Sequence, residues 1–177
     1  MIFTPEHTCA FTGHRPEKLP WGYDETDPRC QALKERMWKA VQEIYDRGYR
    51  HFLCGMALGC DTYFCETVLA LRCLAVGVTV EAVIPHAGQD AKWAEAYREH
   101  YARLVNMCDK QTVLSPCYTA GCMQRRNRHL VDNASLLLSV YDGSSGGTGY
   151  TVGYALQKKV EVMNLTVLGE APQHYYF

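Results

Sequence analysis

The chain has 177 residues, of which 47% are hydrophobic and 21% charged, and its formal net charge is −1. This composition is typical of one folded domain, expected over residues 1–177, and it excludes an intrinsically disordered chain. The near-neutral charge lacks the basic excess of general nucleic-acid binders and argues against nucleic acid as a partner.

Neither a membrane span nor a metal site is expected. No apolar run approaches the roughly 18–20 residues that cross a bilayer, and the N-terminal stretch MIFTPEHTCAFTG lacks the regions of a secretory signal. The nine cysteines are odd in number and include no CxxC pair, which favours reduced and mostly buried thiols. The seven histidines are scattered, without an HExxH motif. We therefore expect a cytoplasmic protein.

In chain order, short apolar runs alternate with longer segments of helical periodicity. A strand is predicted at 7–11, followed by a helix that Asp27 caps, Pro28 begins and Gly48 ends. The remaining strands are predicted at 49–54, 78–85, 110–115, 135–141 and 160–165, and the remaining helices at 61–76, 92–108, 122–134 and 148–159. This alternation implies right-handed βαβ crossovers, so we predict an α/β fold with a mainly parallel sheet of about six strands.

Three of the strands are almost continuously apolar, at 52–54, 80–84 and 136–140. Such strands are typical of a sheet that helices cover on both faces, which makes a three-layer sandwich. In these folds ligands bind beyond the carboxyl ends of the strands. The segments that follow the strands are therefore the candidate sites.

The first strand is followed by TGHRPEKLP at 12–20. Gly13 permits a tight turn there, and His14 and Arg15 are placed to reach an anion; the alternative is an ordinary polar loop.

The third strand ends in PHAGQD at 85–90. His86 is the weaker candidate, because a turn with Asp90 as a helix cap explains that segment equally well.

The second strand is followed by GMALGCD at 55–61, where Gly55, Met56 and Gly59 precede an acidic residue. The glycines let the backbone approach a ligand, and the start of the next helix offers free N–H groups. Asp61 would repel phosphate, so a ribose hydroxyl or a base amino group is the expected partner. The alternative is that Asp61 only caps the helix.

The densest basic cluster in the chain, Arg125, Arg126 and Arg128 with Asn127 among them, follows the fourth strand. At helical spacing Arg125 and Arg128 lie near one face, with Asp132 one turn further, and Arg126 points elsewhere. Not all three arginines can then face one ligand. The alternative is a solvated helix face.

The fifth strand leads into the glycine-rich stretch YDGSSGGTGYTVGYA at 141–155. Asp142 ends the strand, and Gly146, Gly147 and Gly149 surround Thr148 before a helix begins. Without a GK[ST] sequence the loop is no P-loop, but glycines leading into a helix N-terminus suit a phosphate or carboxylate. The alternative is a flexible joint.

Four ordered motifs, TGHRP, GMALGCD, RRNRHLVDNAS and the stretch at 141–155, resemble the YpsA-like family of the SLOG (Smf/DprA–LOG) superfamily. The resemblance covers essentially the whole chain and implies a Rossmann-like fold and a homodimer. Members of that superfamily include single-stranded DNA-binding DNA-processing proteins, cytokinin-activating phosphoribohydrolases and proposed sensors of nucleotide derivatives.

One departure from the superfamily bears on catalysis. The phosphoribohydrolases have a PGGxGTxxE motif whose glutamate assists cleavage of the N-glycosidic bond, and this chain has Gly153 at that position and Tyr150 after GGxG. The missing carboxylate argues against hydrolase activity. The carboxylates that can replace it are those of Asp61, Glu66, Asp132 and Asp142.

The leading interpretation is that the protein binds or senses a nucleotide or nucleotide-derived small molecule, such as a nucleoside monophosphate or an ADP-ribose-like or NAD-like compound. The phosphates of the ligand would lie on the 146–149 loop, and Asp61 would accept a hydrogen bond from a hydroxyl of the ligand. Arg15 and one arginine of the basic cluster would neutralise the negative charge of the ligand. The alternative is an N-glycosidic hydrolase or transferase with unidentified catalytic residues, and single-stranded DNA binding ranks third. No cofactor beyond such a nucleotide is expected.

Overall fold

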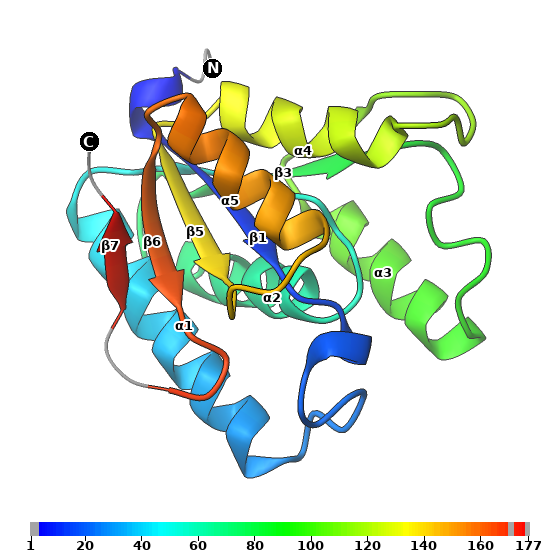
Figure 1. Ribbon diagram of the computed structural model, residues 1–177, viewed down its shortest axis with the longest axis horizontal. Coiled ribbons are helices and arrows are strands. Elements are labelled where there is room, and N and C mark those ends of the chain that lie inside the picture. Colours follow the sequence, from blue (N-terminus) through cyan, green and yellow to red (C-terminus); the bar gives the residue numbers. More distant parts are fainter. Residues whose placement is uncertain (1–3, 170–171, 176–177) are drawn as a thin grey trace.

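The centre of the computed structural model is a seven-stranded sheet in the spatial order β4-β3-β2-β1-β5-β6-β7 (Figure 1). The strands are β1 (Thr8–Gly13), β2 (His51–Cys54), β3 (Thr79–Ile84), β4 (Lys110–Val113), β5 (Leu136–Val140), β6 (Glu161–Leu165) and β7 (Gln173–Tyr175). The helices are α1 (Pro28–Asp46), α2 (Cys60–Arg72), α3 (Glu95–Met107), α4 (Cys122–Asp132) and α5 (Gly147–Gln157). The structure describes residues 4–169 and 172–175.

The predicted fold class is confirmed: β1 to β6 are parallel, and β7 alone runs antiparallel, beside β6. The prediction of about six strands missed β7. The three residues of β7 include one half-buried side chain and show no apolar alternation that would predict a strand. This strand is defined only by its pairing with residues 162–164 of β6. The predicted helix at 61–76 is also too long, because Leu74 and Val76 are exposed beyond its end.

Helix α1 forms as its sequence predicts. The Asp27 carboxylate accepts a hydrogen bond from the Arg29 N–H (2.8 Å), which caps the first turn, and Pro28 takes the first helical position. The stripe that α1 buries consists of Cys30, Leu33, Met37, Ala40, Val41 and Ile44. Because these residues recur every three or four positions, they share the face that packs against the sheet.

Helices cover both faces of the sheet, so the three-layer arrangement is confirmed (Figure 1). One core joins alternate strand residues such as Phe11 and Phe52 to α1, α2 and the end of α3. The other joins the intervening residues, such as Ala10 and Leu137, to α4 and α5. The alternation of strand side chains thus separates the two cores.

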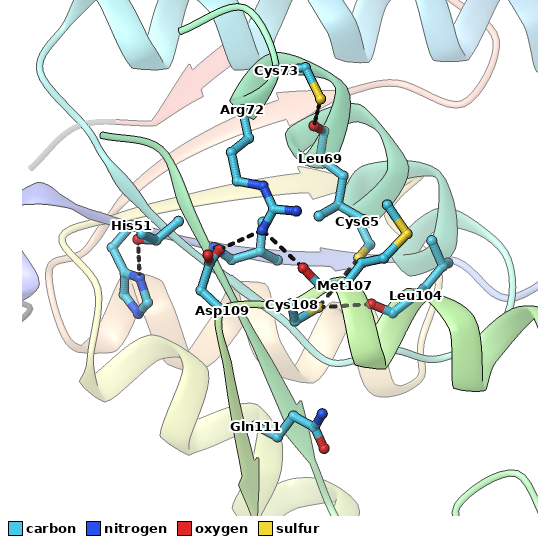
Figure 2. Close-up of polar contacts among 12 residues, drawn as sticks. His51, Cys65, Leu69, Arg72, Cys73, Leu104, Met107, Cys108, Asp109 and Gln111 are labelled. Carbon is cyan, nitrogen blue, oxygen red and sulfur yellow. Dashed lines mark hydrogen bonds and ion pairs between the residues drawn. The ribbon is translucent and has the colours of Figure 1, made fainter. Parts of the chain in front are cut away.

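The end of α3 and the start of β4 are tied to α2 (Figure 2). The Arg72 guanidinium donates to the Met107 carbonyl and to the Asp109 carboxylate, both at 2.9 Å. Asp109 also accepts from the Val80 N–H at 2.8 Å. The thiols of Cys65 and Cys108 lie 3.9 Å apart nearby. All nine cysteines are free thiols, and six of them are buried.

Within residues 4–169 and 172–175, no helix combines the length and apolarity that crossing a bilayer requires. The same residues contain no group of three or more His, Cys, Asp or Glu side chains arranged to hold a metal ion. Residues 1–3, 170–171 and 176–177 of the domain expected over 1–177 lie outside the described residues. Residues 1–3 also belong to the N-terminal stretch that lacks the regions of a secretory signal.

The strand order places a switch point between β1 and β5. From β1 the chain adds β2, β3 and β4 on one side and then returns to add β5, β6 and β7 on the other. The loops that leave the carboxyl ends of β1 and β5 therefore diverge to opposite sides. This is the position at which open α/β sheets have a crevice for a ligand.

Candidate functional site

A cavity of about 280 Å³ lies at this switch point, between the loop after β1, the start of α2, α4 and the start of α5. We call it the first cavity. Eight of the predicted site residues line it: Gly13, His14, Arg15, Asp61, Arg126, Asn127, Gly147 and Thr148. Seven do not: Gly55, Met56, Gly59, Arg125, Asp142, Gly146 and Gly149. Whether any of them contacts a ligand stays a prediction.

The N-terminus of α5 opens into the first cavity without a side-chain cap. Its N-cap residue, Gly146, has φ 139°, and the N–H groups of the first helical turn have no partner within a helix. The partial positive charge of the helix start favours an anion there. The loop after β5 therefore presents free N–H groups to the first cavity, and its role in holding an anion stays a prediction.

Lys18 brings a positive charge to the same loop and was missed by the sequence interpretation. It ends a 3₁₀ turn at Pro16–Lys18, and its ammonium donates to the Ser145 carbonyl and to the Ser144 hydroxyl (3.2 Å). A Cβ on Gly146 would lie 2.9 Å from this ammonium. Glycine at 146 therefore permits the close approach of Lys18 as well as the positive φ.

Asp142 orders the loop after β5 from outside the first cavity. Its carboxylate accepts from the Ser144 N–H and lies 2.9 Å from Nε2 of the buried His14. The hydrogen bonds from Ser144, and then the contact with His14, lower the pKa of Asp142. The contact between His14 and Asp142 links the ends of β1 and β5. This is a structural role for Asp142, which the sequence did not distinguish from contact with a ligand.

Arg126 is the arginine of the basic cluster that enters the first cavity, and it is 6% exposed. Its guanidinium donates to the Gly55 carbonyl and to the Asn127 side chain (2.9 Å), and Nη1 lies 3.9 Å from Asp61 Oδ2. Asp61 also accepts from the Ala57 N–H at 3.1 Å. Burial raises the pKa of Asp61, against the opposing effect of Arg126.

The other two arginines of the cluster point to solvent. Arg125 donates to the Thr119 hydroxyl, and Arg128 lies 3.5 Å from the Tyr150 hydroxyl. The sequence interpretation expected one arginine at the ligand without identifying it. The buried stripe of α4 includes Cys122, Arg126 and Leu130. Their spacing of four residues is the sequence signal that identifies Arg126.

The loop after β2 supports the first cavity from behind. Met56 is buried and has φ 57°, which is uncommon for a residue with a side chain, and Gly59 has φ 87°. A Cβ on Gly59 would lie 2.8 Å from the His14 carbonyl, which accepts from the Cys60 N–H. These residues let the loops after β1 and β2 approach each other. His86 packs edge-on against Tyr118 and does not line the first cavity.

Comparison with known proteins establishes the family. The family model described as YpsA, YspA SLOG family, matches residues 9–168. The chain belongs to the YpsA family. Curated relatives of this YpsA-family chain include the uncharacterised SPbeta prophage-derived protein YoqJ of Bacillus subtilis (strain 168), which is 25% identical over 142 residues, 73% of this chain and 83% of YoqJ. A UPF0398 protein of Bacillus thuringiensis (strain Al Hakam) is 23% identical over 158 residues, 88% and 85% of the two chains.

Solved structures similar to this YpsA-family chain share its fold. DprA, the DNA processing protein A, of Streptococcus pneumoniae superposes with a TM-score of 0.59 at 17% identity, over 91% of this chain and 50% of that protein. DprA of Helicobacter pylori, whose structure was described for its single-stranded DNA binding mode, superposes with a TM-score of 0.58 at 16% identity, over 91% of this chain and 65% of that protein. The protein TM1055 superposes with a TM-score of 0.55 at 17% identity, over 88% of this chain and 71% of that protein. The chain thus spans half to two thirds of the two DprA proteins.

These likenesses bear on one expectation in particular. The near-neutral composition argued against nucleic acid as a partner, and that argument finds no support among neighbours that include a single-stranded DNA binder. Membership in the YpsA family and the Rossmann-like neighbours are compatible with a nucleotide-related role. The choice of ligand has to be argued from the site.

Proposed function

We propose that the protein binds a nucleotide or nucleotide derivative in the first cavity, with its phosphate at the N-terminus of α5. The observation that carries this proposal is the convergence of the uncapped helix start at Gly147 and Thr148 with two cationic side chains, Lys18 and Arg126. Backbone N–H groups and fixed cations at a strand switch point are the usual means of holding a phosphate.

Asp61 is proposed to accept a hydrogen bond from a hydroxyl of the same ligand. Its carboxylate lines the first cavity, where it accepts from the Ala57 N–H and interacts with the more distant guanidinium groups of Arg126 (3.9 Å) and Arg15. A buried carboxylate with oxygen lone pairs to spare favours a donor such as a ribose hydroxyl. Arg15, which is exposed at the rim, would screen the charge of the phosphate.

The test is calorimetric and thermal-shift measurement with nucleoside monophosphates, ADP-ribose, NAD and inorganic phosphate. A ligand that binds the folded state raises the melting temperature by mass action. In the Lys18→Ala variant we expect the affinity for the best ligand to fall by about tenfold, the value of one charge-assisted hydrogen bond. Arg125→Ala is the matched control, because Arg125 is exposed and outside the cavity. Equal losses in both variants would contradict the proposal.

Asp61 also favours a second candidate, cleavage of an N-glycosidic bond. Burial raises the pKa of this carboxyl, and glycosidic cleavage requires a carboxylic acid or carboxylate beside the sugar carbon. Chromatography of the ligands after incubation would detect released base. Release that Asp61→Asn abolishes and Glu66→Gln leaves intact would establish catalysis. Binding without release would leave the protein a binder.

A further inference from the structure

A second cavity, of about 310 Å³, adjoins the first and shares two residues with it. Arg15 and Glu17 line both cavities. Apart from Lys92, the remainder of the second cavity is formed by aromatic and apolar side chains, which are Tyr23, Leu58, Trp93, Ala94 and Tyr97. We call it the aromatic cavity. Each cavity alone is at or below the low end of the roughly 300–1,000 Å³ of small-molecule sites, so one ligand of nucleotide size would extend across both.

The rings of the aromatic cavity are held in place by other rings. Tyr97, in the first turn of α3, lies against Tyr23 from the loop after β1, with centroids 5.4 Å apart and planes tilted by 42°. Trp93 meets Tyr101 edge-on at 5.3 Å and 82°. Tilted and edge-on pairs are favourable aromatic geometries and fix the ring planes. Each ring therefore has a fixed orientation before any ligand binds.

Charged side chains also line the aromatic cavity: Arg15 and Glu17 at its border with the first cavity, and Lys92. Glu17 accepts a hydrogen bond from the Tyr23 hydroxyl (2.8 Å). Hydrogen bonds from its own backbone N–H and from Tyr23 lower the pKa of Glu17, so it is an anion at neutral pH. A carboxylate at this place repels a phosphate and accepts from hydroxyl or amino groups. Because Glu17 borders both cavities, the free N–H groups at the start of α5, with Lys18 and Arg126, are what favour the first cavity for the anionic group of the ligand.

We propose that the aromatic cavity holds the nucleobase of the ligand whose phosphate lies at the N-terminus of α5. This inference rests on the proposed function and adds to it a requirement for a planar ring attached to the sugar phosphate. The ring stacks on the exposed surfaces of Trp93 and Tyr97, and the Arg15 guanidinium lies at its edge beside the sugar. Base stacking on aromatic side chains tolerates different bases, so the ring and its distance from the phosphate define the ligand class.

The test compares ribose 5-phosphate with AMP, GMP, UMP and CMP, which add a base to the same sugar phosphate. The wild-type protein is expected to bind at least one nucleotide about tenfold more tightly than ribose 5-phosphate, as stacking of one base implies. Tyr97→Ala should lose this difference while ribose 5-phosphate binding stays the same. Tyr97→Phe should keep it, and Tyr118→Ala is the control, since this exposed ring lies outside both cavities.

Three outcomes separate this inference from the proposed function. If ribose 5-phosphate binds as well as every nucleotide, or if Tyr97→Ala weakens both equally, the aromatic cavity is not the base site although the phosphate site stands. If neither class of compound binds, the proposed function fails and the inference fails with it. If the nucleotides bind more tightly and Tyr97→Ala removes only that gain, both are supported.

Tryptophan fluorescence provides an independent measurement. A base stacked on Trp93 should quench its emission, and Trp93→Phe should abolish the quenching on addition of the best nucleotide. Trp38→Phe is the control, because Trp38 lies on α1 and lines neither cavity. Quenching that persists in Trp93→Phe and disappears in Trp38→Phe would overturn the placement of the base.

Discussion

Gly55 is the residue whose missing side chain makes the arrangement around Arg126 possible. A Cβ built on Gly55 would lie inside the Arg126 guanidinium, 2.5 Å from its Cζ, and 2.9 Å from Asp61 Oδ2. Both charged side chains are almost fully buried. The closeness of the backbone, rather than an unusual φ, therefore requires glycine at this position.

The Gly55→Ala variant is expected to displace Arg126 and to weaken nucleotide binding. Forcing a methyl group into a packed region costs about 1–3 kcal/mol of unfolding free energy, measurable by urea denaturation. Gly153→Ala, in the interior of α5, is the matched control, because among the described residues no heavy atom outside its own stretch of helix backbone lies within 4 Å of the added Cβ. It should gain about 0.5–1 kcal/mol, the helix preference for Ala over Gly. Equal destabilisation of the two variants would contradict this account.

Glu81 lies on β3, does not line the first cavity, and contributes to stability in acid. Burial alone would raise its pKa, but hydrogen bonds that involve His51, Thr112 and Lys110 outweigh burial and lower the pKa from 4.5 to about 2. The ionised Glu81 thus stabilises the fold above about pH 4.5. This contribution is lost as the pH falls from 4.5 toward 2.

We expect Glu81→Gln to lower the unfolding free energy at pH 7 and to remove part of the loss of stability between pH 4.5 and 2. Urea denaturation at a series of pH values measures both effects. Glu99→Gln serves as the control, since Glu99 is exposed on α3. The explanation fails if the two variants have the same pH dependence as the wild-type protein.

At the scale of the elements, α3 and β4 are the parts most dependent on a few polar contacts. β4 is an edge strand whose residues are mostly exposed, and α3 buries only Leu104 and Val105. The Arg72 guanidinium holds their junction through Met107 and Asp109. β4, which follows this junction, is the outermost strand beside β3 and therefore has a strand neighbour on one side only.

Replacing Arg72 with alanine should loosen this edge without unfolding the centre of the sheet. The loss of hydrogen bonds from a charged donor costs roughly 1.5–3 kcal/mol when buried and less here, where both side chains are about one-third exposed. Hydrogen exchange should accelerate at 110–113 and stay unchanged in β1 and β5. The control is Arg98→Ala, whose ion pair with Asp90 is longer, 3.6 Å. Uniform acceleration over the whole sheet would mean that Arg72 supports the global fold instead.

For the whole molecule, the salt dependence of binding distinguishes a mononucleotide site from a nucleic-acid groove. A nucleotide that pairs with Lys18 and Arg126 should lose less than about tenfold in affinity when salt rises fourfold, because few counterions are released. A single-stranded DNA binder would lose far more. Anisotropy with a labelled oligothymidylate and competition by AMP measure both. Tighter, steeply salt-dependent oligonucleotide binding that Arg125→Ala and Arg128→Ala weaken would make nucleic acid the ligand.

The sequence was sufficient for the order of the elements and for eight of the residues that line the first cavity. Short apolar runs identified β1 to β6, and glycine-rich stretches marked the loops after β2 and β5, because apolar runs and turns are properties of neighbouring residues. The same local signals were too weak for β7, whose three residues are defined only by their pairing with β6. They also extended α2 beyond its true end, where exposed apolar residues follow.

From the sequence, therefore, come an α/β sheet with glycine-rich loops at one edge and a set of candidate polar residues. The packing of the elements shows what the sequence does not: Lys18 and Glu17 line the first cavity together with Arg126, and the aromatic cavity adjoins it. The physical reason is distance along the chain. Lys18 reaches Ser145 across 127 positions of sequence, and such an approach follows from strand order and packing, which local patterns do not encode.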